Sequence, residues 1–376
     1  MKMMTPKSEA ELAEMVAGAD GPLWVRGGGT RGLGGTGEVV SVAGIAGVEL
    51  YEPGALTLVV RAGTPVAEIE AVLAAENQRL AFEPTDHRGL MGTSGAPTIG
   101  GVVAGNISGP RRVQAGACRD FLLGVRFVDG AGQVVRNGGR VMKNVTGYDL
   151  VKLMAGSWGT LGVLTEVALK VLPRPESEAT LSVAVADAEV AVRAMAAALG
   201  SPFEVSGAAF EPGAGVRIRV EGFEASVAYR AGRLNEILSR FGAVSGGDDP
   251  AASAVIWDGL RDVAPFHGVP GDVWRLSVKP SVAPEVAARL RAERLLYDWG
   301  GGLIWALLPE GTDLRGRLGG VAGHATLVRA SEATRARLGM FQPEPEPLRR
   351  ISEGLRARFD PRGILNPGLM AQRVEA

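Results

Sequence analysis

Histidine and cysteine, two residue types that often perform acid–base or nucleophilic chemistry, are scarce in this chain of 376 residues. His87, His267 and His324 are the three histidines, and Cys118 is the one cysteine. One cysteine cannot form an intrachain disulfide, a cysteine-rich zinc site or an iron–sulfur cluster, which needs about four thiolates. Any metal-based electron relay would therefore lie in another chain, and we expect no metal site here.

The sequence around these residues favours structural roles for most of them. Asp86-His87 lies in a polar loop, where a solvated pair is the favoured interpretation. Cys118 is expected to be a small buried residue. His267 has no partner visible in the sequence. For His324 we favour a buried, hydrogen-bonded role, with acid–base catalysis as the alternative.

Glycine is the outlier in the composition, with 54 of 376 residues, about 14% against a usual share of about 7%. Gly27-Gly28-Gly29-Thr30-Arg31-Gly32 matches G-x-G-x-x-G after a predicted strand over 23–26. A Rossmann turn leads directly into a helix, whereas this chain continues through further glycines into a β-like run over 38–42. We therefore expect a loop between two strands whose bare backbone amides bind a dinucleotide pyrophosphate. A flexible loop without a ligand is the alternative.

Two further segments are rich in small residues. The first is TIGGVVAGN at 98–106, followed by Ser108-Gly109. Such a density of small side chains allows a flat ligand to lie against the backbone. The second segment, 156–167, joins a predicted helix to a predicted strand over 162–172. The sequence therefore places three glycine-rich segments around one expected ligand.

The remaining pattern predicts the elements that position these segments. The first part of the chain is expected to contain a helix around 12–16, a strand over 56–62, a helix over 64–76 and a hairpin with strands 121–128 and 133–136. From 177 to 330, strands and helices alternate, which suits an α+β sheet layered with helices. The proline-containing stretch 341–348 is predicted to be an extended linker before a last helix over 349–359 and a turn-rich tail.

Charge and hydropathy exclude several classes of protein. The formal net charge is -1 and the pI is about 6.4, so no positive field attracts phosphodiester backbones, and we expect no nucleic-acid partner. The start of the chain lacks the apolar core of a secretory signal, which favours a cytoplasmic location. The longest uncharged stretch, 90–110, contains glycines and prolines that would leave backbone groups unsatisfied in lipid, so we expect no transmembrane segment.

The order of these motifs resembles the FAD-binding domain of the vanillyl-alcohol-oxidase/PCMH superfamily. The resemblance is carried by VRGGGTRG, EPGALTLVVRAGTP, TIGGVVAGN, GACRDFLLGVRFVDGAGQVV, GYDLVKLMAGSWGTLGVLTEVALKV and FDPRGILNPG. With GGVAGHATLVRA nearer the C-terminus, the chain more narrowly resembles the family of FAD-binding E subunits of bacterial glycolate oxidases.

The resemblance implies an α+β protein with three parts. Residues 1–173 would form a PCMH-type FAD-binding domain made of two α/β subdomains. Residues 174–340 would form an α+β cap, or substrate, domain with an antiparallel sheet covered by helices. Residues 341–376 would return to the FAD domain.

The resemblance also implies which residues bind FAD. The pyrophosphate would lie on Arg26, Gly27, Gly28, Gly29, Thr30, Arg31 and Gly32. The isoalloxazine and ribityl side would lie along Thr98, Gly100, Gly101, Asn106, Ser108 and Gly109. The adenosine half would lie near Gly159, Gly162, Val163 and Thr165, and Asn366 would lie near the flavin ring. For Gly162 and Val163, plain strand packing is the alternative, and for Asn366 a turn-forming role.

The resemblance implies a non-covalent FAD. Some members of the superfamily tether the flavin through a histidine after the first glycine loop, and this chain has Thr30 in that position. Related D-2-hydroxy-acid dehydrogenases carry a metal-binding signature G-H-x-G-D-G-N-x-H. Here Gly323-His324 begins like it and Ala325-Thr326 departs from it.

The implied function is the FAD-binding subunit of a multi-subunit glycolate (2-hydroxy-acid) oxidase. Its partners would be the other subunits, including an iron–sulfur protein that receives electrons, and it would approach a membrane only peripherally, through the complex. Oxidation of a 2-hydroxy acid needs a base for the hydroxyl proton, for which His324 is the candidate, and a cation for the carboxylate. The alternatives are a self-sufficient FAD-dependent oxidoreductase of another hydroxy acid or alcohol, and a non-catalytic scaffold subunit.

Overall fold

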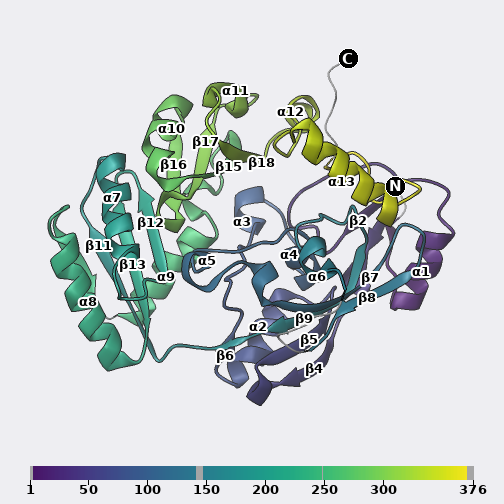
Figure 1. The fold of residues 1–376 in the computed structure, drawn as a ribbon, viewed down its shortest axis with the longest axis horizontal. Coiled ribbons are helices and arrows are strands. Elements are labelled where there is room, and N and C mark those ends of the chain that lie inside the picture. The colour runs from purple at the N-terminus through teal and green to yellow at the C-terminus, as the bar shows by residue number, and fades with distance from the viewer. Residues whose placement is uncertain (1–2, 141–146, 248, 371–376) are drawn as a thin grey trace. The chain divides into compact units, whose positions relative to one another are not determined.

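The computed structural model describes residues 3–140, 147–247 and 249–370, and the chain forms two compact units (Figure 1). The first unit comprises Met1–Ser108, Ala117–Arg174 and Pro343–Ala376. The second comprises Gly109–Gly116 and Pro175–Gln342. The short segment 109–116 thus belongs by its contacts to the second unit although both of its flanks belong to the first.

A three-stranded parallel sheet in the first unit holds the first glycine loop. Its order is β1-β3-β2, with β1 at Met3–Met4, β2 at Leu23–Arg26 and β3 at Glu38–Ser41. Parallel strands need a crossover, because the end of one strand lies far from the start of the next. The loop 27–37 makes the crossover from β2 to β3 and contains no helix. The prediction that this loop is not a Rossmann turn is therefore confirmed.

A five-stranded antiparallel sheet follows in the first unit, in the order β4-β5-β9-β7-β8. Its strands are β4 Val48–Glu52, β5 Thr57–Arg61, β7 Leu122–Val128, β8 Val134–Gly138 and β9 Val163–Lys170. β7 and β8 form the predicted hairpin, in which Asp129 Oδ1 accepts hydrogen bonds from the amides of Ala131 (2.9 Å) and Gln133 (2.8 Å). Two short strands, β6 Gln78–Arg79 and β10 Leu172–Pro173, pair separately.

The helices of the first unit are mostly short. They are α1 Glu9–Ala17, α2 Val66–Ala75, α3 Arg88–Met91, α4 Ile99–Ala104, α6 Leu150–Met154 and α13 Glu346–Phe359. Ser8 caps α1 by accepting a hydrogen bond from the amide of Glu11, as its spacing predicts. α4 was not among the predicted elements, because glycine disfavours helices. Burial of Ile99, Val102 and Val103 stabilises this helix in spite of its two glycines.

The second unit is built on one eight-stranded antiparallel sheet in the order β14-β11-β13-β12-β16-β17-β15-β18 (Figure 1). Its strands are β11 Ser177–Val183, β12 Gly207–Glu211, β13 Gly215–Gly222, β14 Val244–Gly247, β15 Asp272–Val278, β16 Arg294–Asp298, β17 Leu303–Leu308 and β18 Gly323–Arg329. Apolar and polar side chains alternate along β13, where Val216, Ile218 and Val220 lie on one face and Arg217, Arg219 and Glu221 on the other, so one face of the sheet is apolar there.

Helices cover the apolar face of this sheet. The helices of the unit are α5 Arg112–Ala115, α7 Ala188–Leu199, α8 Glu224–Leu238, α9 Pro250–Arg261, α10 Ala283–Leu290, α11 Leu314–Leu318 and α12 Glu332–Leu338. Met195 of α7, Leu234 of α8 and Leu290 of α10 belong to one buried cluster with Trp274 and Ile304 of the sheet. The expected α+β architecture, an antiparallel sheet covered by helices, is confirmed.

The C-terminal tail packs into the first unit beside β2. Leu365 forms a parallel bridge with Leu23, whose amide also donates a hydrogen bond to the carbonyl of Ile364 at 2.8 Å. Ile364 and Leu365 are buried in the same apolar cluster as Leu23 and Val40. The tail therefore extends the parallel sheet at the strand from which the glycine loop departs.

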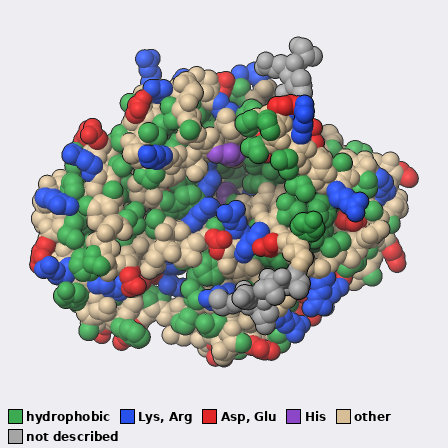
Figure 2. Space-filling model, in the orientation of Figure 1, with side chains coloured by type: hydrophobic (Ala, Val, Ile, Leu, Met, Phe, Trp, Pro, Cys, Tyr) green, Lys and Arg blue, Asp and Glu red, His purple; other side chains and the backbone are tan. Residues whose placement is uncertain are grey.

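The exposed surface carries charges of both signs. In Figure 2, Lys and Arg side chains lie interspersed with Asp and Glu side chains over the face shown, in line with the net charge of -1. Within the part of the chain that the structure describes, no helix combines the length and apolar character needed to cross a bilayer.

Candidate functional site

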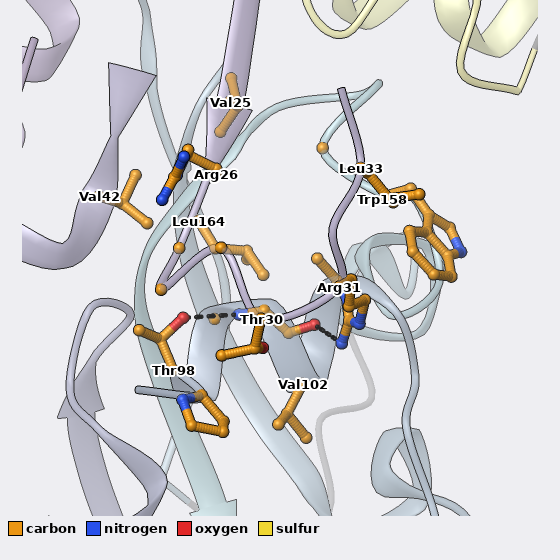
Figure 3. A pocket seen from close by; sticks show the side chains of 18 of the residues that line it. Val25, Arg26, Thr30, Arg31, Leu33, Val42, Thr98, Val102, Trp158 and Leu164 are labelled. Carbon is orange, nitrogen blue, oxygen red and sulfur yellow. Dashed lines mark hydrogen bonds between the residues drawn. The ribbon is translucent and has the colours of Figure 1, made fainter. Parts of the chain in front are cut away.

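A cavity of about 240 Å³ in the first unit lies against the first glycine loop (Figure 3). One water molecule needs only about 10–15 Å³, so this cavity can hold an organic ligand rather than isolated waters. Its walls come from the loop after β2, from Pro97 to Ala104 around α4, from the segment 158–164 leading into β9, and from Asn366 and Leu369 of the tail. The three glycine-rich segments thus meet at one cavity.

Four consecutive backbone amides of the loop are available to a ligand. None of the described residues accepts a hydrogen bond from the amides of Gly28, Gly29, Thr30 or Arg31. Gly29 and Gly32 have positive φ values of 73° and 56°, which turn the chain between these amides. Successive amides in such a turn form a concave set of donors that binds anions. The loop therefore has the donor set expected for a phosphate group.

Gly27 and Gly28 of the loop require glycine because another segment approaches the loop closely. A Cβ atom on Gly28 would lie 1.7 Å from the carbonyl oxygen of Ala96. A Cβ atom on Gly27 would lie 2.1 Å from Oγ1 of Thr98. The glycines thus bring the loop into contact with the segment that precedes α4, and any larger residue would separate the two walls of the cavity.

Arg31 supplies a buried positive charge to the cavity wall. Its Nη2 donates a hydrogen bond to the carbonyl of Gly101 at 2.7 Å, and its guanidinium carbon lies 4.9 Å from the centre of the Trp158 ring. Burial lowers the pKa of Arg31 to about 10, so the side chain remains a cation at neutral pH. None of the described carboxylates forms an ion pair with Arg31. An anionic ligand would supply this missing negative charge.

Thr98 and Gly100 position α4 against the sheet. The hydroxyl oxygen of Thr98 accepts a hydrogen bond from the amide of Gly101 at the start of the helix (Figure 3). The amide of Gly100 donates to the carbonyl of Ala62 at 2.8 Å, and a Cβ on Gly100 would lie 2.7 Å from that of Ala62. A larger residue at 100 would push α4 away from the end of β5.

Asn366 connects the tail with two other walls of the cavity. Its Oδ1 accepts a hydrogen bond from the amide of Val25 at 2.7 Å, and its Nδ2 donates to the carbonyl of Trp158 at 2.8 Å. The side chain is almost fully buried, and the backbone has a φ of 45°, which asparagine tolerates better than most residues. Asn366 is therefore more than a turn former, because it holds β2 and the segment 158–164 together.

Fourteen of the eighteen predicted FAD-binding residues line the cavity. They are Arg26, Gly27, Gly28, Gly29, Thr30, Arg31, Gly32, Thr98, Gly100, Gly101, Gly159, Gly162, Val163 and Asn366. Their common position around one cavity is what a single ligand requires.

The other four predicted residues do not line this cavity. Thr165 donates its hydroxyl hydrogen bond to Glu9 at 2.6 Å. Asn106 accepts a hydrogen bond from the amide of Arg119 at 3.0 Å. Ser108 accepts one from the amide of Cys118, and Gly109 belongs to the second unit. A role of these four residues toward FAD stays a prediction.

Sequence reasoning missed several apolar and aromatic lining residues. These are Trp24, Val25, Leu33, Val42, Pro97, Val102, Ala104, Trp158, Leu164 and Leu369, with Thr85 and His87. Leu33, Val102 and Leu164 directly follow a predicted site residue, and Val25, Pro97 and Trp158 directly precede one. The sequence pattern shows that these side chains are apolar, but it does not show which face of their element borders the cavity.

The burial of His87 contradicts one prediction from the sequence. The interpretation of Asp86-His87 as a solvated loop pair was wrong for the histidine, which is only 8% exposed and lines the cavity. Its Nδ1 lies 3.2 Å from the carbonyl oxygen of Thr85. Cys118 is fully buried as expected, and burial raises the pKa of its thiol far above the usual value.

The exposure of His324 contradicts a second prediction from the sequence. It lies on β18 of the second unit and is exposed, so the favoured interpretation as a buried histidine was wrong. Its Nδ1 lies 3.4 Å from Oγ1 of Thr326. His267, in the same unit, pairs through Nε2 with the carbonyl of Asp262 at 2.7 Å. A catalytic role for His324 stays a prediction.

Comparison with known proteins gives a consistent result. The family model described as "FAD binding domain" matches residues 2–138. The chain is 39% identical over 354 residues to the glycolate oxidase subunit GlcE of Escherichia coli (strain K12), covering 93% of this chain and 92% of that protein. It is 35% identical over 165 residues to the glycolate oxidase subunit GlcD of Bacillus subtilis (strain 168), covering 43% of this chain and 34% of that protein.

A solved structure supports the fold. An alkyldihydroxyacetonephosphate synthase superposes with a TM-score of 0.70 at 17% identity, covering 97% of this chain and 76% of that one. At this identity the likeness concerns the fold alone.

Proposed function

The chain belongs to the family of the glycolate oxidase subunit GlcE, an FAD-binding family of oxidoreductases, and we propose that it is the FAD-binding subunit of a multi-subunit glycolate oxidase. Its substrate class in this proposal is a small 2-hydroxy acid. The observation that carries the proposal is the run of four amides without acceptors at Gly28–Arg31, next to the buried cation of Arg31, on a cavity made by all three glycine-rich segments.

These features fit FAD. The amides and the guanidinium of Arg31 can hold the two negative charges of a pyrophosphate. The apolar walls at Val102, Trp158 and Leu164 suit a ring system (Figure 3). When bound, the flavin supplies the acceptor for a hydride removed from the substrate carbon. The residues of this chain would bind and orient it and exclude water.

We propose that the FAD is bound non-covalently. Thr30 occupies the position at which a tethering histidine is expected and cannot form such a bond. Cys118 is not among the lining residues, and its high pKa leaves little thiolate to react. Precipitation of the purified protein with acid should leave the yellow colour in the supernatant. A yellow pellet would contradict non-covalent binding, and His87 would then be the first residue to replace.

The test of the proposed function is direct. The purified chain should show the absorbance bands of bound flavin, or bind added FAD with quenching of flavin fluorescence at a stoichiometry of one. Absence of flavin absorbance together with failure to bind added FAD would refute the proposal. Turnover of glycolate by the isolated chain with an artificial electron acceptor would instead favour a self-sufficient oxidoreductase.

The proposal includes partner chains. The relatives GlcE and GlcD are both named as subunits of glycolate oxidase, which supports a multi-subunit complex for this chain. We propose that one partner is an iron–sulfur protein that receives the electrons, because one cysteine cannot hold a cluster here. Copurification of the tagged chain, followed by iron and sulfide analysis, tests this. A cytoplasmic location remains part of the proposal and is tested by cell fractionation.

A further inference from the structure

One part of the polar face of the eight-stranded sheet carries an arginine, a histidine and two hydroxyl side chains, which are types that can donate hydrogen bonds to anions. β15 pairs with β18 so that Arg275 faces Thr326 and Ser277 faces His324. Because successive residues of a strand point to opposite faces, these four side chains share one face. Trp274, Leu276, Ala325 and Leu327 lie on the other face, in the apolar core. The register of β15 with β18 therefore brings these four polar side chains together, and no loop is needed to place them.

Arg275 has an unusual environment for a guanidinium group. Its carbon Cζ lies 5.0 Å from the centre of the Trp299 ring, and Cζ of Arg112 lies 4.6 Å from the same ring. Burial, reinforced by the charge of Arg112, lowers the pKa of Arg275 to about 10. None of the described residues accepts a hydrogen bond from the guanidinium of Arg275. Its five donors are thus available while its charge is retained at neutral pH.

Charged side chains of both signs lie around Trp299. Arg275 and Arg112 bring two positive charges to the ring, and the nearby carboxylate is that of Asp298. Asp298 Oδ1 also accepts a hydrogen bond from the amide of Trp299 at 2.7 Å. The guanidinium of Arg275 is partly buried and has no acceptor among the described residues, an arrangement that is favourable only with an anion or another acceptor beside it.

The position of Arg112 is fixed by neighbouring bonds within the second unit. The preceding residue, Arg111, forms a two-pronged ion pair with Glu221, with hydrogen bonds of 2.9 and 2.7 Å. The indole nitrogen of Trp299 donates to the carbonyl of Gly109 at 3.1 Å. These bonds hold the segment 109–116 against the sheet, so the two guanidiniums are held in place before any ligand arrives, which lowers the entropic cost of binding.

We propose that Arg275, flanked by Thr326 and His324 and supported by the charge of Arg112, binds the carboxylate of a small 2-hydroxy or 2-oxo acid. This inference rests on the proposed function and identifies the cation that the substrate needs. A planar guanidinium matches the two oxygens of a carboxylate, and hydroxyl and imidazole groups on the same sheet face can bond a neighbouring oxygen of the acid.

The test compares a charged ligand with a neutral one. Isothermal titration of the full chain with glycolate and with glycolamide, which lacks the charge, should show binding of glycolate alone. Arg275→Met should weaken glycolate binding by about ten- to a hundredfold, the range expected for hydrogen bonds to a charged group. Arg275→Lys, which keeps the charge but not the planar guanidinium group, should bind glycolate with an intermediate affinity. Arg193→Met, on the exposed side of α7, is the matched control and should bind like the wild type.

Two results would overturn the inference. One is equal affinity of the wild type for glycolate and glycolamide, or no glycolate binding at all. The other is wild-type affinity in Arg275→Met with an unchanged circular dichroism spectrum. Flavin absorbance is recorded on the same samples, with and without added FAD. If the chain binds FAD but Arg275→Met binds glycolate like the wild type, this inference alone is refuted. If the chain fails to bind FAD, the proposed function is refuted.

Discussion

Asn366 donates a hydrogen bond from its side-chain amide to the carbonyl of Trp158 at 2.8 Å, across 208 residues of sequence. The same side chain accepts from the amide of Val25 at 2.7 Å. The C-terminal tail thereby holds together two walls of the cavity that are far apart in the chain.

Replacement of Asn366 by alanine should destabilise the first unit and weaken FAD binding. The change leaves two buried backbone groups without partners, and each such loss costs about 1–3 kcal/mol. Urea unfolding and FAD titration measure the two effects. Asn366→Asp keeps the acceptor for Val25 but places a buried carboxylate against the carbonyl oxygen of Trp158, so its loss of stability should be at least as large. Wild-type stability of the alanine variant would contradict the role assigned to the tail.

Gly28→Ala should abolish or strongly weaken FAD binding. The added Cβ would lie 1.7 Å from the carbonyl oxygen of Ala96, so the loop must move. This movement would displace its four amides from their place in the cavity wall. Gly34→Ala is the control, because a Cβ there meets nothing within 4 Å. Flavin fluorescence quenching measures affinity, and near-ultraviolet circular dichroism checks that the variant is folded. If Gly28→Ala binds FAD as the wild type does, the loop is not the pyrophosphate site.

Arg31→Met should lower the affinity for FAD by about tenfold or more, because it removes a charge-assisted contact to an anionic ligand. The affinity of the wild type should not change between pH 6 and 8 on account of this residue, since its pKa of about 10 keeps it protonated. Arg136→Met, an exposed arginine on β8, is the control. Equal affinities of the two variants would exclude Arg31 from the site.

Glu9 should make the stability of the chain depend on pH in the acid range. Its carboxylate accepts hydrogen bonds from Arg126 of β7 and Thr165 of β9, and the bond from Arg126 is the main reason that its pKa lies below the usual value. The unfolded chain therefore takes up this proton at a higher pH than the folded chain. The stabilisation is complete above the unfolded pKa and is lost as the pH falls through the folded one.

The measurement for Glu9 is urea unfolding of the wild type and Glu9→Gln from pH 7 down to pH 3. The wild type should be the more stable at pH 7, and the difference should shrink once the pH passes below about 4.5, the ordinary pKa of a glutamate. A difference that is constant over this range would show that the ion pair with Arg126 does not contribute.

Glu221→Ala should strongly destabilise the second unit. Glu221 forms an ion pair with Arg111 at 2.7 Å and lies 3.7 Å from Arg219, and all three side chains are buried. Removal of one partner of a buried pair typically costs about 3–5 kcal/mol, because the other charge remains in a dry environment. Glu236→Ala breaks an exposed pair with Arg233 and should cost less than about 1 kcal/mol. Thermal unfolding of both variants tests the contrast.

The sequence predicted the elements with strong periodicity and the residues with special backbone needs. The strand over 23–26, the hairpin around Asp129 and the glycines of the loop follow from local rules, since alternation, turn chemistry and absent Cβ atoms are visible in a short window. The helix α4 could not be predicted because its stability comes from burial of Ile99 and Val103 and outweighs the low helix propensity of glycine.

The parts of the site that escaped prediction depend on long-range pairing. His87 is buried because of what packs over its loop, and no local pattern contains that information. Arg275 could not be distinguished from the other arginines until the register of β15 with β18 placed it beside Thr326. The proposed assignment of the glycine-rich segments to FAD came from motif order, but their convergence at one cavity depends on contacts such as that of Asn366 with Trp158.

The segment 109–116 has a consequence for attempts to separate the two units. A fragment cut at Pro175 and Gln342 would lack Arg111, so the buried Glu221 would lose a counter-ion, and Trp299 would lose both Arg112 and its acceptor at Gly109. The complementary fragment would carry an eight-residue loop in which Arg111 has lost Glu221 and Arg112 has lost Trp299. To express either unit alone, residues 109–116 would therefore have to be removed from the first unit and supplied to the second.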